Sequence, residues 1–426
     1  MSGVPSGPRH VAIIGSGAVG VISAIEALHD GHKVTLIDPG PPGGEQAASY
    51  GNAGWLSSHS VIAPAEPGSW KRVPKFLSDP LGPVTLRWRY LPKALPWLIR
   101  YLRSGATPAK LEATAVALRA LLKDAPLLHQ RLADEAGAGD LIERQGVMHV
   151  FPSRADFDGE ALAWSIRRRV GVEWLELGSD ELRQRLPELH PRYTFAVLVE
   201  EAGRCRDPGG YVAALAAHAR SLGADYVAEP AKGLKIERGR LKSVVTDKHD
   251  IACEKAVIAA GAHSKALCAR IGDDLPLETE RGYHVMVENP EVEPRMSFMA
   301  SEARFVVNPM KVGLRAAGQV EIAGLKAAPN WQRAEILRSQ LAGLLPGLPT
   351  ALPADRVKIW MGHRPSMPDG RPCIGKSRAT GDVVYAFGHG HIGLVGSART
   401  GRLVAQLLGG REPEIPVRPF DPRRYL

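Results

Sequence analysis

The pattern of hydrophobic and polar positions predicts a strand, a helix and a second strand at the start of the chain. Residues 11–14 form an apolar, β-branched run of the kind that builds a buried parallel strand. A helix follows over residues 18–30, Gly31 closes it, and residues 33–37 predict the next strand. This order is that of a βαβ unit.

The turn inside this unit has the sequence G-S-G-A-V-G. Its first glycine allows a tight turn, the second lets the backbone approach a pyrophosphate, and the third lets the helix pack closely on the strand. The first helical turn points its free N–H groups at the phosphates, and an acid after the second strand can accept hydrogen bonds from a ribose. We therefore expect a dinucleotide site, for NAD or FAD alike, at Gly15, Gly17, Ala18, Val19, Gly20 and Asp38.

The middle of the chain loses this alternation. Residues 110–135 carry leucines and alanines near a spacing of 3.6, which predicts one long amphipathic helix. A strand over 146–151 and a helix over 155–170 follow. Because these elements lack a βαβ rhythm, we expect a separate second domain here.

The chain then returns to the first pattern. A helix is predicted over 208–222, short strands follow it, and residues 255–261 form a buried strand that runs into a glycine. Near the C-terminus, a strand over 383–387 enters a glycine turn and a helix over 394–408. A nucleotide domain that the chain leaves and re-enters is typical of flavoproteins and less so of NAD dehydrogenases.

Composition narrows the function. The 426 residues include 54 Lys and Arg against 45 Asp and Glu, spread without a basic block, which favours anionic ligands and gives no sign of nucleic-acid binding. The four cysteines show no C-x-x-C spacing, so we expect reduced thiols in a cytoplasmic protein and no metal site. No apolar leader and no apolar run of membrane-spanning length is present, so we expect neither a secretory signal nor a transmembrane helix.

Residues 69–103 interleave basic and aromatic side chains, with Asp79 as their single acid. Such a surface can dock peripherally on anionic lipid at the inner face of a membrane. Alternatively, tryptophans anchor the segment on the core while arginine stems extend outward. We favour the second interpretation, because the amphipathic pieces are short.

Four motifs occur in order: VAIIGSGAVG…TLID, ASYGNAG, VIAAGAHS, and HRPSMPDGRPCIG followed by VYAFGHGHIGLVGSARTGRLVAQLL. Together they resemble the FAD-dependent D-amino-acid oxidase superfamily, which includes glycine and sarcosine oxidases, and most of all its D-amino-acid dehydrogenase small-subunit branch. The chain departs from the family pattern at three positions. Asp38 stands where glutamate is usual, Pro39 where a basic residue is common, and His391 where glycine oxidases have an arginine.

The resemblance implies a combined α/β and α+β fold, in which a Rossmann-type FAD-binding domain is interleaved with a mixed-sheet substrate-binding domain. We expect the FAD-binding domain over 1–66, 205–277 and 361–426, and the substrate-binding domain over 67–204 and 278–360. The implied reaction is oxidative deamination, in which hydride passes from an amino acid α-carbon to flavin N5 and the imine is hydrolysed. The FAD is expected to be noncovalent, since Cys373 is not suitably placed for a linkage.

The resemblance also implies roles for individual residues. Arg364 matches the arginine that binds the substrate carboxylate, to which a guanidinium fork is suited. We expect catalytic roles for Arg364, Tyr283 and His389, and substrate contacts from Arg364, Tyr283, His363, His391 and Tyr50. Further FAD contacts are expected from Ser49, Asn52, Ala53, Gly54, Leu56, Ala231, Ala260, Gly261, Gly390, His391, Ile392, Gly393 and Leu394.

Several alternatives stay open. The substrate is a D-amino acid, or a secondary amino acid such as D-proline, hydroxyproline, sarcosine or iminodiacetate. The electron acceptor is oxygen, a quinone or another acceptor, and a homo-oligomer is compatible with the sequence. Two other functions compete: an NAD(P)-dependent dehydrogenase, and a non-catalytic flavin-bearing subunit of an assembly.

Overall fold

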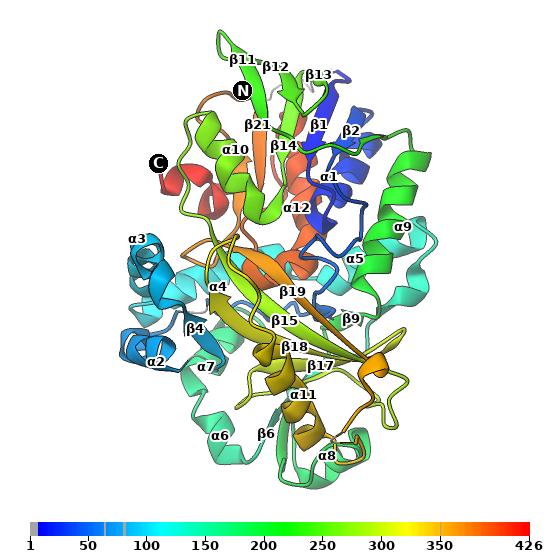
Figure 1. The fold of residues 1–426 in the computed structure, drawn as a ribbon, viewed down its shortest axis with the longest axis vertical. Coiled ribbons are helices and arrows are strands. Elements are labelled where there is room, and N and C mark those ends of the chain that lie inside the picture. The colour runs from blue at the N-terminus through cyan, green and yellow to red at the C-terminus, as the bar shows by residue number, and fades with distance from the viewer. Residues whose placement is uncertain (1–6, 64, 80–81, 350) are drawn as a thin grey trace.

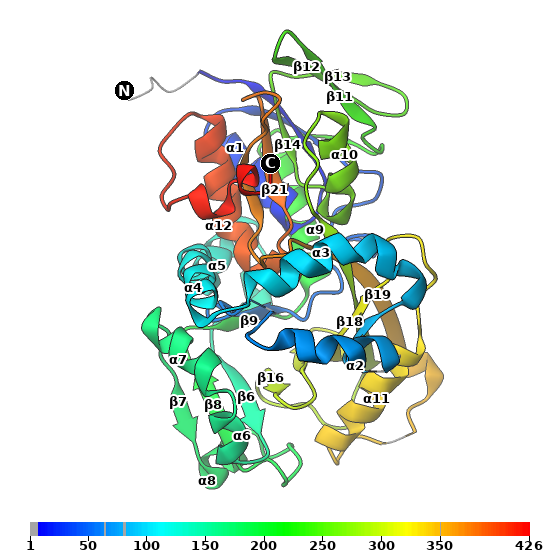
Figure 2. The ribbon, with the colours of Figure 1, turned by 90° about the vertical axis from the view of Figure 1, so that its left-hand side faces the viewer.

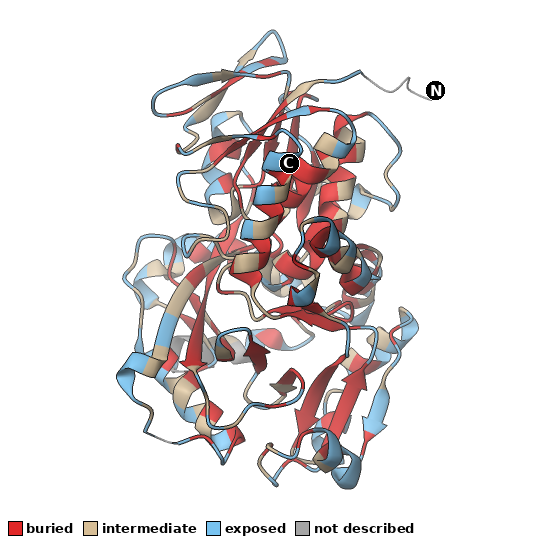
Figure 3. Ribbon diagram, turned by 90° about the vertical axis from the view of Figure 1, so that its right-hand side faces the viewer, coloured by how far each residue is buried: buried red, intermediate tan, exposed pale blue. Residues whose placement is uncertain are grey.

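Two large β-sheets lie at opposite ends of an elongated molecule (Figure 1). The computed structural model describes residues 7–63, 65–79, 82–349 and 351–426. Buried residues concentrate in the strands of both sheets and in the helices packed on them (Figure 3). The predicted fold class is confirmed, because a nucleotide-binding sheet is combined with a mixed second sheet.

The first sheet contains the predicted βαβ unit. Its six strands, in spatial order, are β10 (Asp225–Val227), β2 (Lys33–Ile37), β1 (His10–Ile14), β14 (Lys255–Ile258), β21 (Val383–Phe387) and β20 (Cys373–Lys376). All neighbours are parallel except β20 and β21. Strands from three separate parts of the chain thus form one sheet.

Two helices whose N-termini face the same side pack together on this sheet (Figure 1). They are α1 (Ala18–His29) and α12 (Gly393–Leu408). A Cβ on Gly401 would lie 2.7 Å from the Ile22 side chain, so a glycine is needed for this close packing. A third helix, α9 (Pro208–Ser221), packs against α1.

The second sheet has nine strands. In spatial order they are β19 (Val357–Ser366), β15 (Glu278–Glu288), β18 (Gly313–Ile322), β17 (Phe305–Met310), β16 (Phe298–Ala300), β6 (Val147–Phe151), β8 (Phe195–Val199) and β7 (Leu175–Leu177), with β4 (Val84–Leu86) paired to β18. Helix α11 (Gln332–Leu344) packs on its apolar side. The domain boundaries remain a prediction, and β19 crosses the one expected at residue 360.

Smaller elements complete the chain. The remaining strands are β3 (Trp55–Leu56), β5 (Ile142–Glu143), β9 (Gly203–Cys205), β11 (Gly233–Glu237), β12 (Arg240–Val245) and β13 (Asp250–Ala252). The remaining α-helices are α2 (Val73–Ser78), α3 (Leu91–Ser104), α4 (Pro108–Leu122), α5 (Ala125–Glu135), α6 (Arg154–Asp158), α7 (Ala161–Arg169), α8 (Ser179–Arg185) and α10 (Ser264–Arg270). Every helix of the described residues is too short or too polar to cross a bilayer.

The prediction of one helix over 110–135 is wrong. The helix ends at Leu122, Asp124 adopts a left-handed φ of 62°, and α5 starts afresh. Pro126 explains the break, because in a continuous helix it could not donate a hydrogen bond to the Leu122 carbonyl and its ring would clash with that carbonyl, whereas proline is tolerated in the first turn of a new helix. The predicted helix over 155–170 is likewise divided into α6 and α7.

Residues 69–79 and 82–103 form a cover between the two sheets (Figure 2). Helix α3 buries Ala94, Trp97 and Leu98, and the Trp97 indole donates a hydrogen bond of 3.2 Å to the Ser366 carbonyl. By contrast, the side chains of Trp70 and Trp88 are 65% and 63% exposed. All four cysteines are buried free thiols, as the sequence predicts.

Candidate active site

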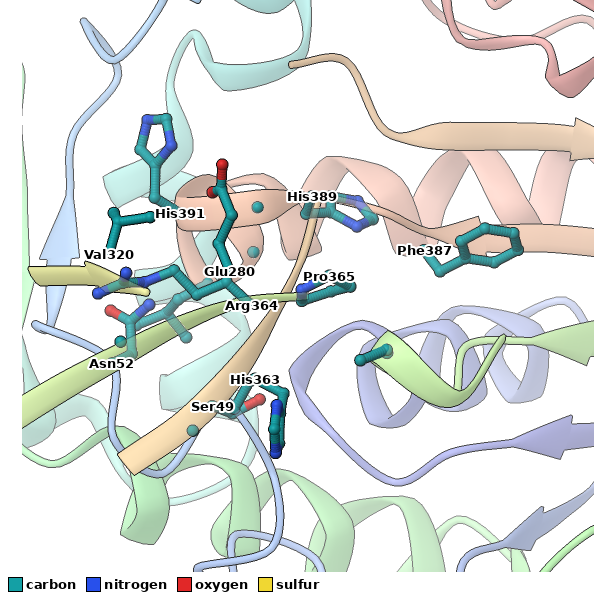
Figure 4. Close-up of a pocket in the computed structure, with 18 of the residues that line it drawn as sticks. Ser49, Asn52, Glu280, Val320, His363, Arg364, Pro365, Phe387, His389 and His391 are labelled. Atoms are coloured by element: carbon teal, nitrogen blue, oxygen red, sulfur yellow. The ribbon is translucent and has the colours of Figure 1, made fainter. Parts of the chain in front are cut away.

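A cavity of about 1180 Å³ lies between the two sheets. It extends from the C-terminal end of β2, at Asp38, to Arg364 on β19. Figure 4 shows the part of its lining around Arg364. The lining includes residues of α3 as well as His149 and Arg167. The cavity is therefore long enough to join the predicted dinucleotide site to the predicted substrate site.

The glycine turn has the geometry that phosphate binding requires. Gly15 has a φ of 109°, and a Cβ there would lie 2.4 Å from the Ala259 carbonyl oxygen. A Cβ on Gly20 would lie 1.9 Å from the Gly15 carbonyl oxygen, so this position also excludes any side chain. The Ala18 amide, at the start of α1, donates to the Ser49 hydroxyl over 3.0 Å. The positive end of the α1 dipole thus opens on the cavity.

Asp38 lies where an adenosine ribose is expected. Its two carboxylate oxygens accept hydrogen bonds from the backbone amides of Ser16, at 2.8 Å, and Gly40, at 3.0 Å. A carboxylate can accept about four hydrogen bonds, so capacity remains for two ribose hydroxyls. The two amides orient the carboxylate.

A second helix N-terminus also meets the cavity. The 3₁₀ turn η6 (Gly390–Ile392) leads directly into α12, whose 16 residues give a full helix dipole. Gly390, Gly393 and Leu394 line the cavity. This end can stabilise negative charge that develops on a bound ring system.

His389 holds this turn in place. Its Nε2 lies 3.0 Å from the Thr400 hydroxyl, which itself donates to the Gly396 carbonyl over 2.8 Å. The Thr400 proton is therefore used, so the His389 Nε2 must be the donor. Burial lowers the pKa of His389 to about 3, so the ring is neutral. Its Nε2 proton is therefore committed to Thr400, and the expected catalytic role of His389 stays a prediction.

Arg364 is the cation at the substrate end of the cavity. Its Nη1 and Nη2 donate to the carbonyl oxygens of Gln319, at 2.8 Å, and Gly318, at 3.2 Å. A Cβ on Gly282 would lie 2.2 Å from Nη2, so the glycine makes room for the guanidinium. Burial lowers the pKa of Arg364, but a guanidinium stays charged at any physiological pH. These contacts orient a fork that retains donors for a carboxylate.

Two further histidines line the cavity (Figure 4). His363 bonds the Thr279 hydroxyl through Nδ1 over 2.9 Å, and burial lowers its pKa to about 4. The His391 side chain is exposed to the cavity, yet the surrounding protein, assisted by Arg364, lowers its pKa to about 4. Both rings are neutral near pH 7, so Arg364 is the charged group among these three side chains.

The two predicted tyrosines are placed differently. The Tyr283 hydroxyl donates to Glu321 over 2.7 Å and accepts from the Asn330 amide, and its ring packs in the core beneath α11. Tyr50 does not line the cavity, and its hydroxyl donates to Glu45 over 3.2 Å. Successive side chains of a strand point to opposite faces, so Tyr283 turns its hydroxyl away from the face that carries Arg364. The expected substrate contacts of these hydroxyls therefore do not match the structure.

Most predicted residues meet at this one cavity. Those that line it are Gly15, Gly17, Ala18, Val19, Asp38, Ser49, Asn52, Ala53, Ala231, Ala260, Gly261, Tyr283, His363, Arg364, His389, Gly390, His391, Gly393 and Leu394. Those that do not are Gly20, Tyr50, Gly54, Leu56 and Ile392. The last group shapes the backbone or fills the core: Leu56 and Ile392, for example, are buried in the main hydrophobic cluster.

Sequence reasoning missed Glu280, Trp97 and Tyr101, which also line the cavity. The available signal for Glu280 was a charged residue in a buried strand position, two positions before Gly282 and between Glu278 and Arg281 in the sequence. Trp97 and Tyr101 stack with ring centroids 5.1 Å apart on α3, a spacing of four residues that places both on one helix face.

One cluster of metal-ligand side chains lies outside the cavity. His29, Glu135 and His218 bring their ligand atoms within 4.8 Å of one another. Their helices, α1, α5 and α9, belong to the outer layer of the nucleotide-binding sheet. The expectation that the protein binds no metal stays a prediction.

Comparison with known proteins agrees with this geometry. The family model described as FAD dependent oxidoreductase matches residues 10–407. A D-amino-acid oxidase of Bradyrhizobium diazoefficiens is 70% identical over 423 residues, covering 99% of this chain and 100% of the relative. A D-amino acid dehydrogenase of Rhizobium johnstonii is 28% identical, covering 97% and 99%. The crystal structure of glycine oxidase from Geobacillus kaustophilus superposes with a TM-score of 0.74 at 22% identity, covering 99% and 100%.

Proposed function

The chain belongs to the family of FAD-dependent oxidoreductases, and we propose that it oxidises D-amino acids with oxygen as electron acceptor. The observation that carries the proposal is the relative named D-amino-acid oxidase, 70% identical over 99% of this chain. Because the family binds FAD, the chain is not interpreted as an NAD(P)-dependent dehydrogenase. Because the family consists of oxidoreductases, it is not interpreted as a non-catalytic flavin-bearing subunit.

The residues fit FAD. Two helix N-termini, at Ala18 and Gly393, open on one elongated cavity, and the backbone around Gly15 leaves no room for a side chain. When bound, FAD supplies the acceptor for the two electrons and the α-hydrogen of the substrate. The first helix end suits the pyrophosphate, and the second suits negative charge on the reduced ring system.

The protein contributes position and electrostatics. Arg364 binds the substrate carboxylate, which fixes the α-carbon relative to the ring system. Trp97 and Tyr101 on α3 cover the cavity and limit the access of water. His363, His389 and His391 are neutral near pH 7, so they place no second positive charge beside the substrate amine.

Oxygen consumption tests this proposal. D-alanine should drive oxygen uptake with an equal yield of hydrogen peroxide, and L-alanine should not. D-proline, hydroxyproline, sarcosine, glycine and iminodiacetate complete the panel, because the sequence leaves secondary amino acids open. Preferential oxidation of an L- or secondary amino acid would contradict the D-amino acid proposal. Reduction of a quinone analogue without peroxide would contradict the oxidase proposal.

We also propose that the enzyme acts in the cytoplasm and that residues 69–103 serve as a cover of the cavity. The contact of Trp97 with Ser366 supports this role. In the alternative interpretation, in which this segment docks on a membrane, the exposed side chains of Trp70 and Trp88 would make the contact. The protein should stay in the supernatant when vesicles containing anionic lipid are sedimented. Co-sedimentation that is lost in a Trp70→Ala, Trp88→Ala variant would contradict the proposal.

A further inference from the structure

Glu280 is a buried acid at the substrate end of the cavity that the proposed function does not use. It lies on β15 directly opposite Arg364 on β19 in the antiparallel pairing, so both side chains leave the same face of the sheet (Figure 4). Its Oε2 accepts a hydrogen bond from the Ser366 hydroxyl over 2.9 Å. Within the described residues, its Oε1 has no protein donor, although Glu280 lines the cavity.

Glu280 and Arg364 do not neutralise each other by contact. Among the ion pairs of the described residues, none joins their charged groups within 4.0 Å, and Arg364 instead donates to two backbone carbonyls. Buried charges are normally paired. Glu280 and Arg364 are neighbours on one sheet face and both line the cavity. Such an unpaired acid and base are complementary to a ligand that carries both charges on one carbon, which is the form of a free amino acid.

We propose that Glu280 binds the ammonium group of the substrate and accepts its proton before the α-hydrogen leaves. This inference rests on the proposed function. It makes Glu280 a catalytic residue, since its Oε1 touches the substrate nitrogen. Arg364 then holds the carboxylate and Glu280 holds the amine, so the two residues together fix the orientation of the α-carbon.

The step balances without another reactant. One N–H bond of the ammonium group breaks and an O–H bond forms at Glu280 Oε1, which leaves a neutral amine with a free lone pair. That lone pair forms the C=N bond as the α-hydrogen leaves with two electrons. The proposed oxidation of the amino acid already provides an acceptor for this hydrogen and these electrons. The product is a protonated imine, and the Glu280 proton is later lost to water.

The surroundings of Glu280 favour this role. The groups that face it are Arg364 and Ser366 on β19, Glu278 on β15, His389 just before η6, His391 on η6, and Tyr101 on α3. Burial raises the pKa of Glu280, the nearby Glu278 contributes in the same direction, and Ser366 and Arg364 oppose the shift. A raised pKa makes a carboxylate a better proton acceptor. Both histidines are neutral near pH 7, and the His389 Nε2 proton is already committed to Thr400.

The test compares Glu280→Gln with Glu278→Gln in the FAD-loaded enzyme. Glu278 lies two positions earlier on β15, but its carboxylate accepts hydrogen bonds from the Tyr90 hydroxyl and the Thr279 amide and does not line the cavity. Two probes are used: D-alanine, followed by anaerobic reduction of the flavin, and propionate, which has the carboxylate but no amine, followed by its perturbation of the flavin spectrum.

We expect Glu280→Gln to slow reduction by D-alanine about 10²- to 10⁴-fold at pH 7. The loss should shrink about tenfold per pH unit as pH rises, because the free amine then enters without proton transfer. Propionate should bind at least as tightly as to the wild type, since a buried negative charge beside Arg364 is gone. Glu278→Gln should show neither the loss at pH 7 nor the recovery with rising pH. Because Glu278 helps to raise the pKa of Glu280, the expected effect of this control is a small shift of the pH profile toward lower pH.

Two results overturn the inference. One is reduction of Glu280→Gln at nearly the wild-type rate at pH 7. The other is an equal loss of D-alanine and propionate binding, which would mark Glu280 as structural. If no D-amino acid reduces the wild-type flavin, the proposed function fails and the inference falls with it. If D-alanine reduces the flavin of the wild type and of Glu280→Gln at similar rates, the inference about Glu280 fails and the proposed function stands.

Discussion

Replacing Arg364 by lysine tests the substrate end of the cavity. Lysine keeps the positive charge but loses the planar fork that binds a carboxylate through two parallel hydrogen bonds. The guanidinium is half-buried and is oriented by the Gln319 and Gly318 carbonyls at 2.8 and 3.2 Å, so its geometry is fixed before substrate binds. An ammonium group on a flexible stem cannot reproduce both contacts.

The size of the effect follows from the burial of the pair. Truncating one partner of a buried, hydrogen-bonded charge pair costs about 2–5 kcal/mol. Because lysine retains the charge, we expect the lower part of this range, about 2–3 kcal/mol. At about 1.4 kcal/mol for each factor of ten, kcat/KM for a D-amino acid should fall about 30- to 150-fold.

The assay is anaerobic reduction of the bound flavin by D-alanine in a stopped-flow instrument. Arg371→Lys is the matched control, because Arg371 follows in the same sequence motif but pairs with Asp369 over 2.8 Å and does not line the cavity. Both variants should retain FAD. Wild-type kcat/KM in Arg364→Lys, or an equal loss in Arg371→Lys, would refute the assignment of Arg364 to the substrate carboxylate.

Three other outcomes are expected. Asp38→Ala removes the acceptor for two backbone amides and for the ribose, so FAD should bind about 10- to 100-fold more weakly. Ultrafiltration measures the affinity, and an unchanged value would contradict this role. Acid precipitation of the FAD-loaded enzyme should leave the flavin in the supernatant, since Cys373 is fully buried and its pKa is raised to about 11; a yellow pellet would show a covalent bond. Acidification from pH 7 to 5 should lower the urea midpoint of unfolding, because burial holds the pKa of His149 and His389 at about 3 while the unfolded chain binds these protons near pH 6.5. Each histidine then lowers the free energy of unfolding by up to about 1.4 kcal/mol per pH unit. A constant midpoint would contradict their burial.

The dinucleotide site could be predicted because its signals are contiguous. The glycine turn, the helix behind it and Asp38 all lie within the first forty residues, and each has a local physical requirement. The second helix N-terminus at Gly393 repeats that local pattern and was predicted for the same reason. Pattern reasoning succeeds where one short segment contains its own explanation.

The substrate end depends on contacts between distant segments. Glu280 acquires its place only when β15 pairs with β19, more than 80 residues later, in a register that sets it opposite Arg364. Tyr283 was assigned to the site from its motif, but a regular alternation of faces turns its hydroxyl toward Glu321. A shift of register by one residue would exchange these faces, and no local signal fixes that register.

Helix interruptions were missed for a different reason. The apolar spacing over 110–135 continues across Lys123 and Asp124, so periodicity alone predicts one helix. The left-handed φ of Asp124 and the proline at 126 start a second helix with the same apolar face. Proline was the available signal, and it outweighs periodicity where the two conflict.

An anaerobic absorbance titration of the purified, FAD-loaded protein tests the central claim most directly. D-alanine should bleach the flavin band, L-alanine should leave it unchanged, and admitting air should restore the band with release of hydrogen peroxide. A flavin band that no amino acid bleaches would contradict the account.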